Sequence, residues 1–452
     1  MSNIPPFHSD SAHTARVVLA ALLTILMLAD YTQAEDWWQF RGPNSGHSVV
    51  QGLPLEWDSF FREPKWKTLI PGKGWSSPVV VGDRVWLTSA EQVALQNSAV
   101  GDKLAELPFG AYDLVTDASV KLFAIELNAQ TGELMRRIDL FERQAPDPIH
   151  AMNSYASPTP ATDGERLYCH FGALGTACVE IASGGVLWRQ ELVVDEITGP
   201  AASPVLWNNQ LILACDGADQ QYLIALDKFT GEPNWKVERP EITVIDATWR
   251  RAFSSPLIVD SGERVQLISM SAQWLISINP DDGSLWWRAK VGSGYSAVPT
   301  PVHAGGRVFV CTGFPKAELV AVDIGGSGDV SDSAIAWRHV RQVPEISSPI
   351  EIDGDLYFAS SQGVISCLDA ATGELYWQKR VGGNFAASPL FADGSIYFSN
   401  SAGVTTVIQP GHDYVELARN ELFGETYASP AIYGNRILLR TNPYLFCLEV
   451  TP

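Results

Sequence analysis

Residues 225–235 read Ala-Leu-Asp-Lys-Phe-Thr-Gly-Glu-Pro-Asn-Trp, and variants of this pattern decide the fold. Each variant has a small residue, an aliphatic residue and usually an acid, then a turn, then a strand that opens with Trp. Glycine supplies the positive-φ geometry of a tight turn, and Asp and Thr side chains can satisfy its backbone amides. The pattern therefore predicts pairs of antiparallel strands, repeated along the chain.

A second motif, a small residue followed by Ser-Pro, marks the start of each repeat. The copies are Ser77-Pro78, Ser157-Pro158, Ser203-Pro204, Ser255-Pro256, Ser348-Pro349, Ser388-Pro389 and Ser429-Pro430, with a degenerate copy at Val298-Pro299. Successive copies lie 40 to 52 residues apart, except for a first interval of 80. Each Pro is followed by an apolar stretch, a turn and a β-rich run. Four short antiparallel strands in this length are typical of a β-propeller blade.

The last repeat stops after its third strand, and the missing Trp strand lies at residues 64–69. We therefore predict an all-β fold over residues 64–450: a single eight-bladed β-propeller of four-stranded antiparallel blades. Pairing of the N- and C-terminal segments closes the ring and removes an open sheet edge. Between neighbouring blades we expect the docking residues Trp66, Trp188, Trp235, Trp287, Trp337 and Trp377.

The first 34 residues carry the pattern of a secretory signal peptide. An apolar run, Val17 to Ala29, follows Arg16 and precedes Thr32-Gln33-Ala34. We expect cleavage near Ala34 and export to the periplasm or the extracellular space. The run is shorter than the roughly 20 residues that span a bilayer, and no transmembrane segment is expected in the mature chain. Residues 35–63 are expected to form an N-terminal segment.

The long first interval contains an insertion at about residues 89–119. Its stretches from Val93 and from Leu104 are compatible with helix and lack the alternation of a strand. A lid or partner surface and a merely tolerated loop both fit these residues.

Composition restricts the partners. The chain has 51 acids and 31 bases, a net charge of −20, so it lacks the basic footprint of a nucleic-acid-binding protein. A monomer is expected. Among the six cysteines, Cys178, Cys367 and Cys447 occupy the small-residue position that Ala225 holds elsewhere. All six are interpreted as buried small residues, and a Cys169–Cys178 bridge remains the alternative.

The repeated Ala-Leu-Asp-x-x-Thr-Gly-x-x-x-Trp pattern is similar to the tryptophan-docking motif of quinoprotein-type eight-bladed propellers. That superfamily includes the pyrroloquinoline quinone (PQQ) dehydrogenases and BamB. Residues 37–44, Trp-Trp-Gln-Phe-Arg-Gly-Pro-Asn, resemble the start of secreted, planctomycete-type PQQ-binding-like β-propeller repeat proteins, as do residues 328–331 with 336–338, and 382–389. The resemblance covers essentially residues 35–450 and implies a fold and a family, while activity must be argued from a site.

The resemblance implies that a PQQ dehydrogenase would hold its quinone and Ca²⁺ near the propeller axis. The sequence has no adjacent Cys pair and no CxxCH, and its eight His show no metal-ligand spacing. The acidic, Gly-rich residues 323–332 do not match a calcium loop and are expected to form a solvated loop. No metal site is expected and no cofactor is required.

We therefore expect a non-catalytic exported propeller, similar to BamB, that binds an envelope protein or a polymeric or glycan ligand in the cell envelope. The first alternative is a dehydrogenase, an oxidoreductase dependent on PQQ and Ca²⁺. The second alternative is a carbohydrate-binding or carbohydrate-processing propeller.

Candidate binding residues lie in the loops before each Ser-Pro, because such loops surround the mouth of a propeller's axial channel. The candidates are Lys73, Trp75, Asn153, Tyr155, Trp249, Arg250, Arg251, Arg341, Asn384 and Tyr427, and the same loops carry Tyr295, Glu345 and Glu425. In so acidic a chain, the adjacent Arg250 and Arg251 could together hold a carboxylate or a sugar acid. The alternative is that these arginines pair with local acids and that the aromatic residues wedge between blades.

Overall fold

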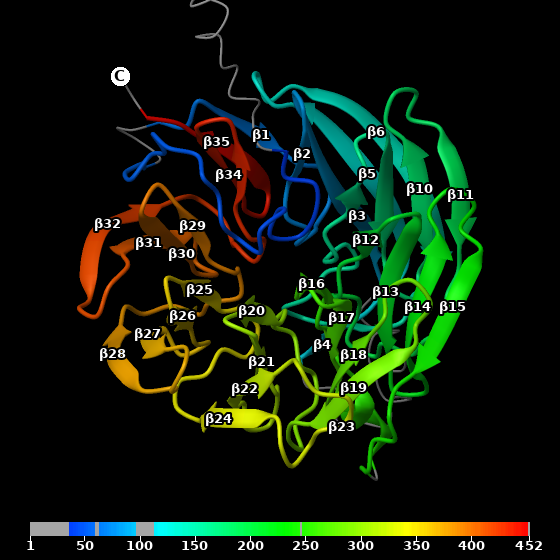
Figure 1. Ribbon diagram of the computed structural model, residues 1–452. Helices are drawn as coiled ribbons and strands as arrows, with labels where there is room; N and C mark the ends of the chain where they lie inside the picture. Colours follow the sequence, from blue (N-terminus) through cyan, green and yellow to red (C-terminus); the bar gives the residue numbers. More distant parts are fainter. Residues whose placement is uncertain (1–35, 59–62, 96–112, 245, 451–452) are drawn as a thin grey trace, which may run out of the picture. The chain divides into compact units, whose positions relative to one another are not determined.

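Eight sheets, each built on four antiparallel strands, follow one another around a central axis (Figure 1). This computed structural model describes residues 36–58, 63–95, 113–244 and 246–450. The predicted eight-bladed β-propeller is thereby confirmed. The segment 1–34, with its expected signal peptide, lies outside the described residues. In the part that is described, no helix has the length and apolarity needed to cross a membrane.

Blades are numbered here by the chain order of their innermost strands, and each is given from its innermost strand outward. Blade 1 contains β2 (Val79–Val81), β3 (Arg84–Ala94), β5 (Asp117–Asn128) and β6 (Leu134–Gln144), and blade 2 contains β8 (Ala161–Thr162), β9 (Arg166–His170), β10 (Thr176–Glu180) and β11 (Val186–Gln190). Blade 3 contains β12 (Val205–Trp207), β13 (Gln210–Asp216), β14 (Gln221–Asp227) and β15 (Pro233–Glu238), and blade 4 contains β16 (Leu257–Asp260), β17 (Val265–Met270), β18 (Trp274–Ile278) and β19 (Leu285–Lys290).

Blade 5 contains β20 (Val302–Ala304), β21 (Arg307–Cys311), β22 (Leu319–Asp323) and β24 (Ile335–His339), and blade 6 contains β25 (Ile350–Ile352), β26 (Asp355–Ala359), β27 (Val364–Asp369) and β28 (Leu375–Arg380). Blade 7 contains β29 (Leu390–Ala392), β30 (Ser395–Ser399), β31 (Val404–Gln409) and β32 (Val415–Glu421), and blade 8 contains β33 (Ala431–Tyr433), β34 (Arg436–Arg440), β35 (Tyr444–Leu448) and β1 (Trp66–Leu69). Blade 8 thus joins the two ends of the propeller, as predicted: β1 pairs with β35, with Trp66 opposite Cys447.

Four short elements lie outside this scheme. The strand β23 (Gly328–Asp329) adds to the outer edge of blade 4 by pairing in parallel with β19. The strands β4 (Leu114–Val115) and β7 (Ile149–His150) form a separate two-stranded sheet. The 3₁₀ helix η1 (Ala247–Arg250) precedes blade 4, and the side chain of Asp246 caps its start. Residues 323–332 thus connect β22 to β24 as a largely exposed interstrand segment, and they add the two-residue strand β23 to the neighbouring sheet.

The sheet register explains the small residue of the repeat. In blade 3, Ala225 of β14 lies directly opposite Trp235 of β15. Cys367 and Trp377 face each other in the same way in blade 6. A small side chain on the third strand therefore leaves room for the indole on the fourth.

Each docking indole also reaches the next blade. Trp188, Trp235, Trp337 and Trp377 donate their Nε1–H to backbone carbonyls of the following blade at 3.0–3.2 Å, and Trp66 of blade 8 donates to Ala129 in blade 1. All six tryptophans therefore dock between blades, since the fully buried Trp287 packs in the cluster that joins blades 4 and 5, and five of them also donate across the blade boundary. Trp287 differs, because its Nε1–H donates to Gln266 within its own blade.

All six cysteines are buried and free, as the interpretation as small residues required. Cys169 packs in the cluster between blades 1 and 2, whereas Cys178 packs in the cluster between blades 2 and 3. The two thiols thus lie on opposite faces of one sheet, which excludes the alternative Cys169–Cys178 bridge.

The insertion begins and ends as strand. Residues 89–94 continue β3, and residues 117–119 belong to β5, so the two strands form a long hairpin arm. Helix was the wrong expectation for Val93 and Ala94, because cross-strand pairing with β5 overrides their weak local preference. The stretch from Leu104 lies outside the described residues.

Candidate functional site

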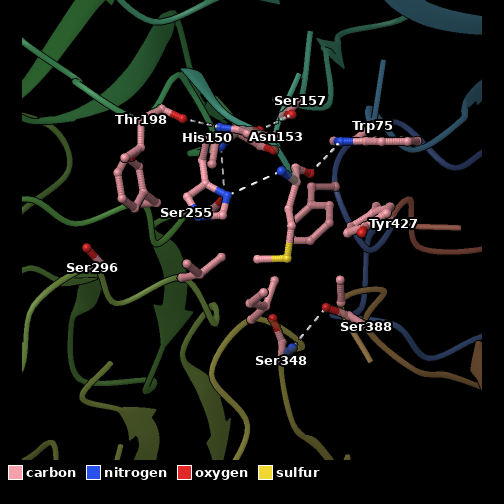
Figure 2. Close-up of a pocket in the computed structure, with 18 of the residues that line it drawn as sticks. Trp75, His150, Asn153, Ser157, Thr198, Ser255, Ser296, Ser348, Ser388 and Tyr427 are labelled. Atoms are coloured by element: carbon pink, nitrogen blue, oxygen red, sulfur yellow. Dashed lines mark hydrogen bonds between the residues drawn. The ribbon is translucent and has the colours of Figure 1, made fainter. Parts of the chain in front are cut away.

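A cavity of about 360 Å³ lies on the axis of the propeller (Figure 2). All eight blades contribute to its wall. Serine and threonine residues of the Ser-Pro segments form a belt around it: Ser77, Ser157, Thr159, Ser203, Ser255, Ser348, Ser388 and Ser429. The volume falls at the lower end of the range typical of small-molecule sites.

This belt is held by hydrogen bonds that pass from blade to blade. At seven of the eight boundaries between neighbouring blades, a backbone N–H of one blade donates to a side-chain hydroxyl of the next at 2.8–3.0 Å. The bonds run from Ser77 to Thr159, Thr159 to Ser203, Ser203 to Ser255, Thr300 to Ser348, Ser348 to Ser388, Ser388 to Ser429 and Ser429 to Ser77. The break falls between Ser255 and Thr300, beside the degenerate Val298-Pro299 copy, where the buried Thr300 hydroxyl has no hydrogen-bond partner among the described residues. The Ser-Pro motif therefore serves ring closure.

The N-terminal segment closes one end of the axis. Trp37 exchanges two backbone hydrogen bonds with Val80 of blade 1, and the carbonyl of Trp38 accepts from Thr162 in blade 2. Arg41 then donates from Nη2 to the carbonyl of Pro349, which leads into blade 6, on the opposite side of the ring, at 2.7 Å. Phe40, between these anchors, lines the cavity. We call residues 37–48 the axial plug, because they cross the axis and make the cavity blind at this end.

Four of the ten predicted mouth residues line the cavity: Trp75, Asn153, Arg251 and Tyr427. Tyr295 from the same loops lines it as well. Trp75 and Tyr427 pack together with their ring centroids 4.5 Å apart. Asn153 is fixed by its side-chain N–H groups, which donate to the carbonyls of Thr198 and Pro200.

The other six predicted residues lie elsewhere. Lys73 stands over the ring of Trp75 at 5.3 Å, and burial lowers the pKa of its ammonium. Tyr155 is buried between blades 1 and 2 and donates its hydroxyl to the Asp147 carbonyl. Trp249 stacks on Tyr295, with parallel rings 5.3 Å apart, and remains half exposed. Arg341 is exposed, whereas the carbonyl of Asn384 accepts from the backbone of Ser401.

Arg250 and Arg251 do not act as a pair. Arg250 ends η1 and lines a second pocket of about 290 Å³ with Asp219, Glu238 and Arg239. Arg251 follows in extended conformation and lines the axial cavity. The turn of the 3₁₀ helix sends adjacent side chains in different directions, so the prediction that both guanidiniums hold one anion is not met by this geometry.

Several lining residues were not identified from the sequence. His150 ends β7, Met152 follows it, and Thr198 precedes Ser203, and all three line the cavity. Phe314 comes from the loop between β21 and β22, and Phe40 from the plug. The only sequence signal for Phe40 is its place in the unusual Trp-Trp-Gln-Phe-Arg stretch, since its partners are distant in sequence.

Arg251 supplies the positive charge of the cavity. Burial lowers the pKa of its guanidinium, while Asp195 and Asp246 oppose this shift through space. His150 lies near it: burial lowers the pKa of this imidazole, Asp113 opposes the shift, and the charge of Arg251 adds to it. His150 is therefore neutral at pH 7.

The described lining does not fit a quinone held on calcium. Calcium binds carboxylate, carbonyl and amide oxygens, and no Asp or Glu lines the cavity. Elsewhere in the described ranges, no cluster of three His, Cys, Asp or Glu residues has a metal-binding arrangement. The six cysteines are packed in the buried clusters of the blades, and none of them lines the cavity.

Known proteins resemble this chain in both sequence and fold. The family profile described as outer membrane protein assembly factor BamB matches residues 123–330 and 329–410. A curated relative of that name from Yersinia pestis is 25% identical over 181 residues, which cover 39% of this chain and 42% of the relative. The chain thus matches less than half the length of that relative.

Solved structures share the propeller at low identity. BamB from Moraxella catarrhalis has a TM-score of 0.52 and 13% identity, covering 80% of this chain and 99% of its own. A europium-containing methanol dehydrogenase has a TM-score of 0.60 and 10% identity, covering 92% and 91%. At these identities the likeness extends to the fold alone.

Proposed function

Since the chain belongs to the BamB-like family of PQQ-type β-propellers, we propose that it is a non-catalytic binding scaffold of the cell envelope. Its partner is an envelope protein, which docks over the mouth of the axial cavity. Export of the chain, expected from the sequence, places it in the compartment where such a partner is found.

The observation that carries the proposal is the apolar mouth of a blind cavity. Met152 and Phe314 line the cavity, Trp249 stacks on the lining residue Tyr295, and all three keep more than a third of their surface exposed. Exposed large apolar residues that gather in one place are typical of interaction sites, and Met and aromatic side chains are enriched at protein interfaces. Met152 lines the cavity, two residues after His150 in the chain.

Among the described residues, no carboxylate and no cysteine lines the cavity. The lining combines hydroxyls already engaged in the belt, aromatic rings, one guanidinium and one imidazole. This composition supports binding over catalysis and supports a role without a quinone cofactor.

Site-specific photo-crosslinking tests the proposal. A photoreactive phenylalanine analogue replaces Met152 in the full chain, and crosslinks are formed in intact cells of the source bacterium. The control replaces Leu375 on the outer strand β28, because the two side chains are equally exposed, at 41% and 40%. We expect a discrete protein adduct from position 152 and none from position 375. Equal adducts from both positions, or none from 152, contradict the proposal, and a glycan adduct favours the carbohydrate alternative.

A further inference from the structure

The guanidinium of Arg251 is uncompensated in the axial cavity. Its Nε is buried without a hydrogen-bond partner among the described residues. Tyr295, Asp195 and Asp246 act on its charge through space, and within the described residues no carboxylate forms an ion pair with it. By contrast, the buried Arg239 is held by Asp216 through two hydrogen bonds of 2.6 and 2.8 Å. Arg251 is partly buried, and a partly desolvated cation without an ion-pair partner has a cost that an anionic ligand relieves.

His150 supplies a second donor beside it. The Nδ1 atom of His150 accepts the backbone N–H of Met152 at 3.2 Å, so the neutral ring carries its proton on Nε2. This Nε2–H makes no hydrogen bond to the described residues, and His150 lines the cavity together with Arg251. The backbone of His150 is anchored as well, because its N–H donates to the Thr198 carbonyl at 3.1 Å and its carbonyl accepts the backbone N–H of Asn153 at 2.8 Å (Figure 2).

The other residues of the cavity wall restrict the charge and the polarity of the anion that fits. The cavity has one cation and no carboxylate in its lining, and apolar side chains such as Phe253, Phe314 and Ile346 make up much of the remaining wall. One guanidinium compensates one negative charge. A phosphate dianion would leave charge uncompensated in a protein that already carries −20.

We infer that the axial cavity binds a monocarboxylate attached to an apolar body, with the carboxylate on Arg251 and His150. This inference deepens the proposed function by naming the chemistry that enters the mouth. The carboxylate belongs either to a free small acid or to an apolar C-terminal residue of the docked protein. Both sources present the same group to the same two donors.

Calorimetric titration of the full chain tests this assignment. The small probes are 3-phenylpropionate and its neutral amide, and the peptide probes are a pentapeptide ending in Phe with a free or an amidated C-terminus. We expect each acid to bind at least tenfold more tightly than its amide, since charge-assisted hydrogen bonds are the stronger class. Tighter binding of the free-acid peptide than of 3-phenylpropionate assigns the source to a polypeptide end, and the reverse order assigns it to a small acid.

Variants locate the contact. Arg251→Gln should weaken binding of the acid at least tenfold, Arg251→Lys should restore part of it, and His150→Gln should cost a smaller factor. Arg250→Gln is the matched control, because this neighbouring guanidinium lines the other pocket. Thermal unfolding verifies that each variant is folded. Inorganic phosphate should bind more weakly than the acid.

Equal binding of acid and amide, no binding of either acid at millimolar concentration, or equal effects of the Arg250 and Arg251 variants would overturn the inference. The two proposals fail separately. If a partner crosslinks at position 152 but no carboxylate binds, the proposed scaffold function stands and the carboxylate site is refuted. If a carboxylate binds but no partner crosslinks, the carboxylate site stands and the scaffold function is refuted.

Discussion

The indole of Trp337 in blade 5 lies against Gly373, the turn glycine of blade 6. A Cβ built on Gly373 would lie 2.6 Å from the Trp337 ring, and the glycine has a φ of +74°. The same contact joins Trp188 to Gly231 and Trp66 to Gly132. The Thr-Gly turn and the Trp of the repeat therefore belong to one interface, shared by successive blades.

Gly373→Ala should destabilise the protein twice over, through backbone strain and through a clash with the indole. We expect a loss of about 2–4 kcal/mol in the free energy of unfolding. Gly394→Ala is the matched control, because its φ is +69° and nothing lies within 4 Å of the added Cβ. That variant should lose only about 1–2 kcal/mol. Denaturant unfolding measures both losses, and equal values would remove the indole from the explanation.

The hydrogen-bonded belt predicts opposite behaviour at two equivalent threonines. The Thr159 hydroxyl accepts the backbone N–H of Ser77 at 2.8 Å, whereas the buried Thr300 hydroxyl has no partner among the described residues. Thr159→Val should cost about 1–3 kcal/mol, because it strands a buried N–H. Thr300→Val should be neutral or stabilising. A comparable loss at both positions in thermal and denaturant unfolding would contradict the belt.

The axial plug predicts contrasting effects at adjacent tryptophans. Trp37 is fully buried between blades, whereas Trp38 is 46% exposed. Trp37→Ala should cost about 3–5 kcal/mol, and Trp38→Ala should change stability little. Trp37→Phe should recover most of the loss, because the buried Nε1 of Trp37 has no hydrogen-bond partner among the described residues. Melting temperatures of the three variants provide the measurement, and a Phe variant as unstable as the Ala variant would show that the indole nitrogen is required.

Glu196 predicts a pH dependence of stability. Burial raises the pKa of this carboxyl to about 7, although it accepts the backbone N–H of Ala173. The folded state thus binds this proton more tightly than the unfolded chain, and its contribution to stability falls as pH rises from about 4.5 to 7. Glu196→Gln, which stays neutral, should raise the melting temperature relative to wild type at pH 8 and change it little at pH 5. The exposed Glu133→Gln should show no such trend, and parallel curves for both variants would refute the assignment.

The repeat pattern predicted the blades because each repeat carries its own turn, small residue and Trp within 40 to 52 residues. Ring closure was predictable too, since β1 supplies the strand that the last repeat lacks. The plug was not, because Arg41 and Pro349 are 308 residues apart and no local periodicity links them. The side chains of Arg250 and Arg251 point in different directions because a 3₁₀ turn ends between them. The sequence of these adjacent residues does not predict that turn.

The composition of blade 8 has a consequence for the order of folding. The strand β1 is synthesised before every other strand of the propeller, yet its partner β35 is the last to be made. Seven blades can assemble as an open arc while β1 remains unpaired. The pairing of β1 with β35 joins the two ends of the propeller, and contacts between residues far apart in sequence form slowly. An exposed strand edge on that arc is the species most prone to pair with another chain. Conditions that delay synthesis or delivery of residues 444–448 should therefore favour aggregation over closure, even where the finished ring is stable.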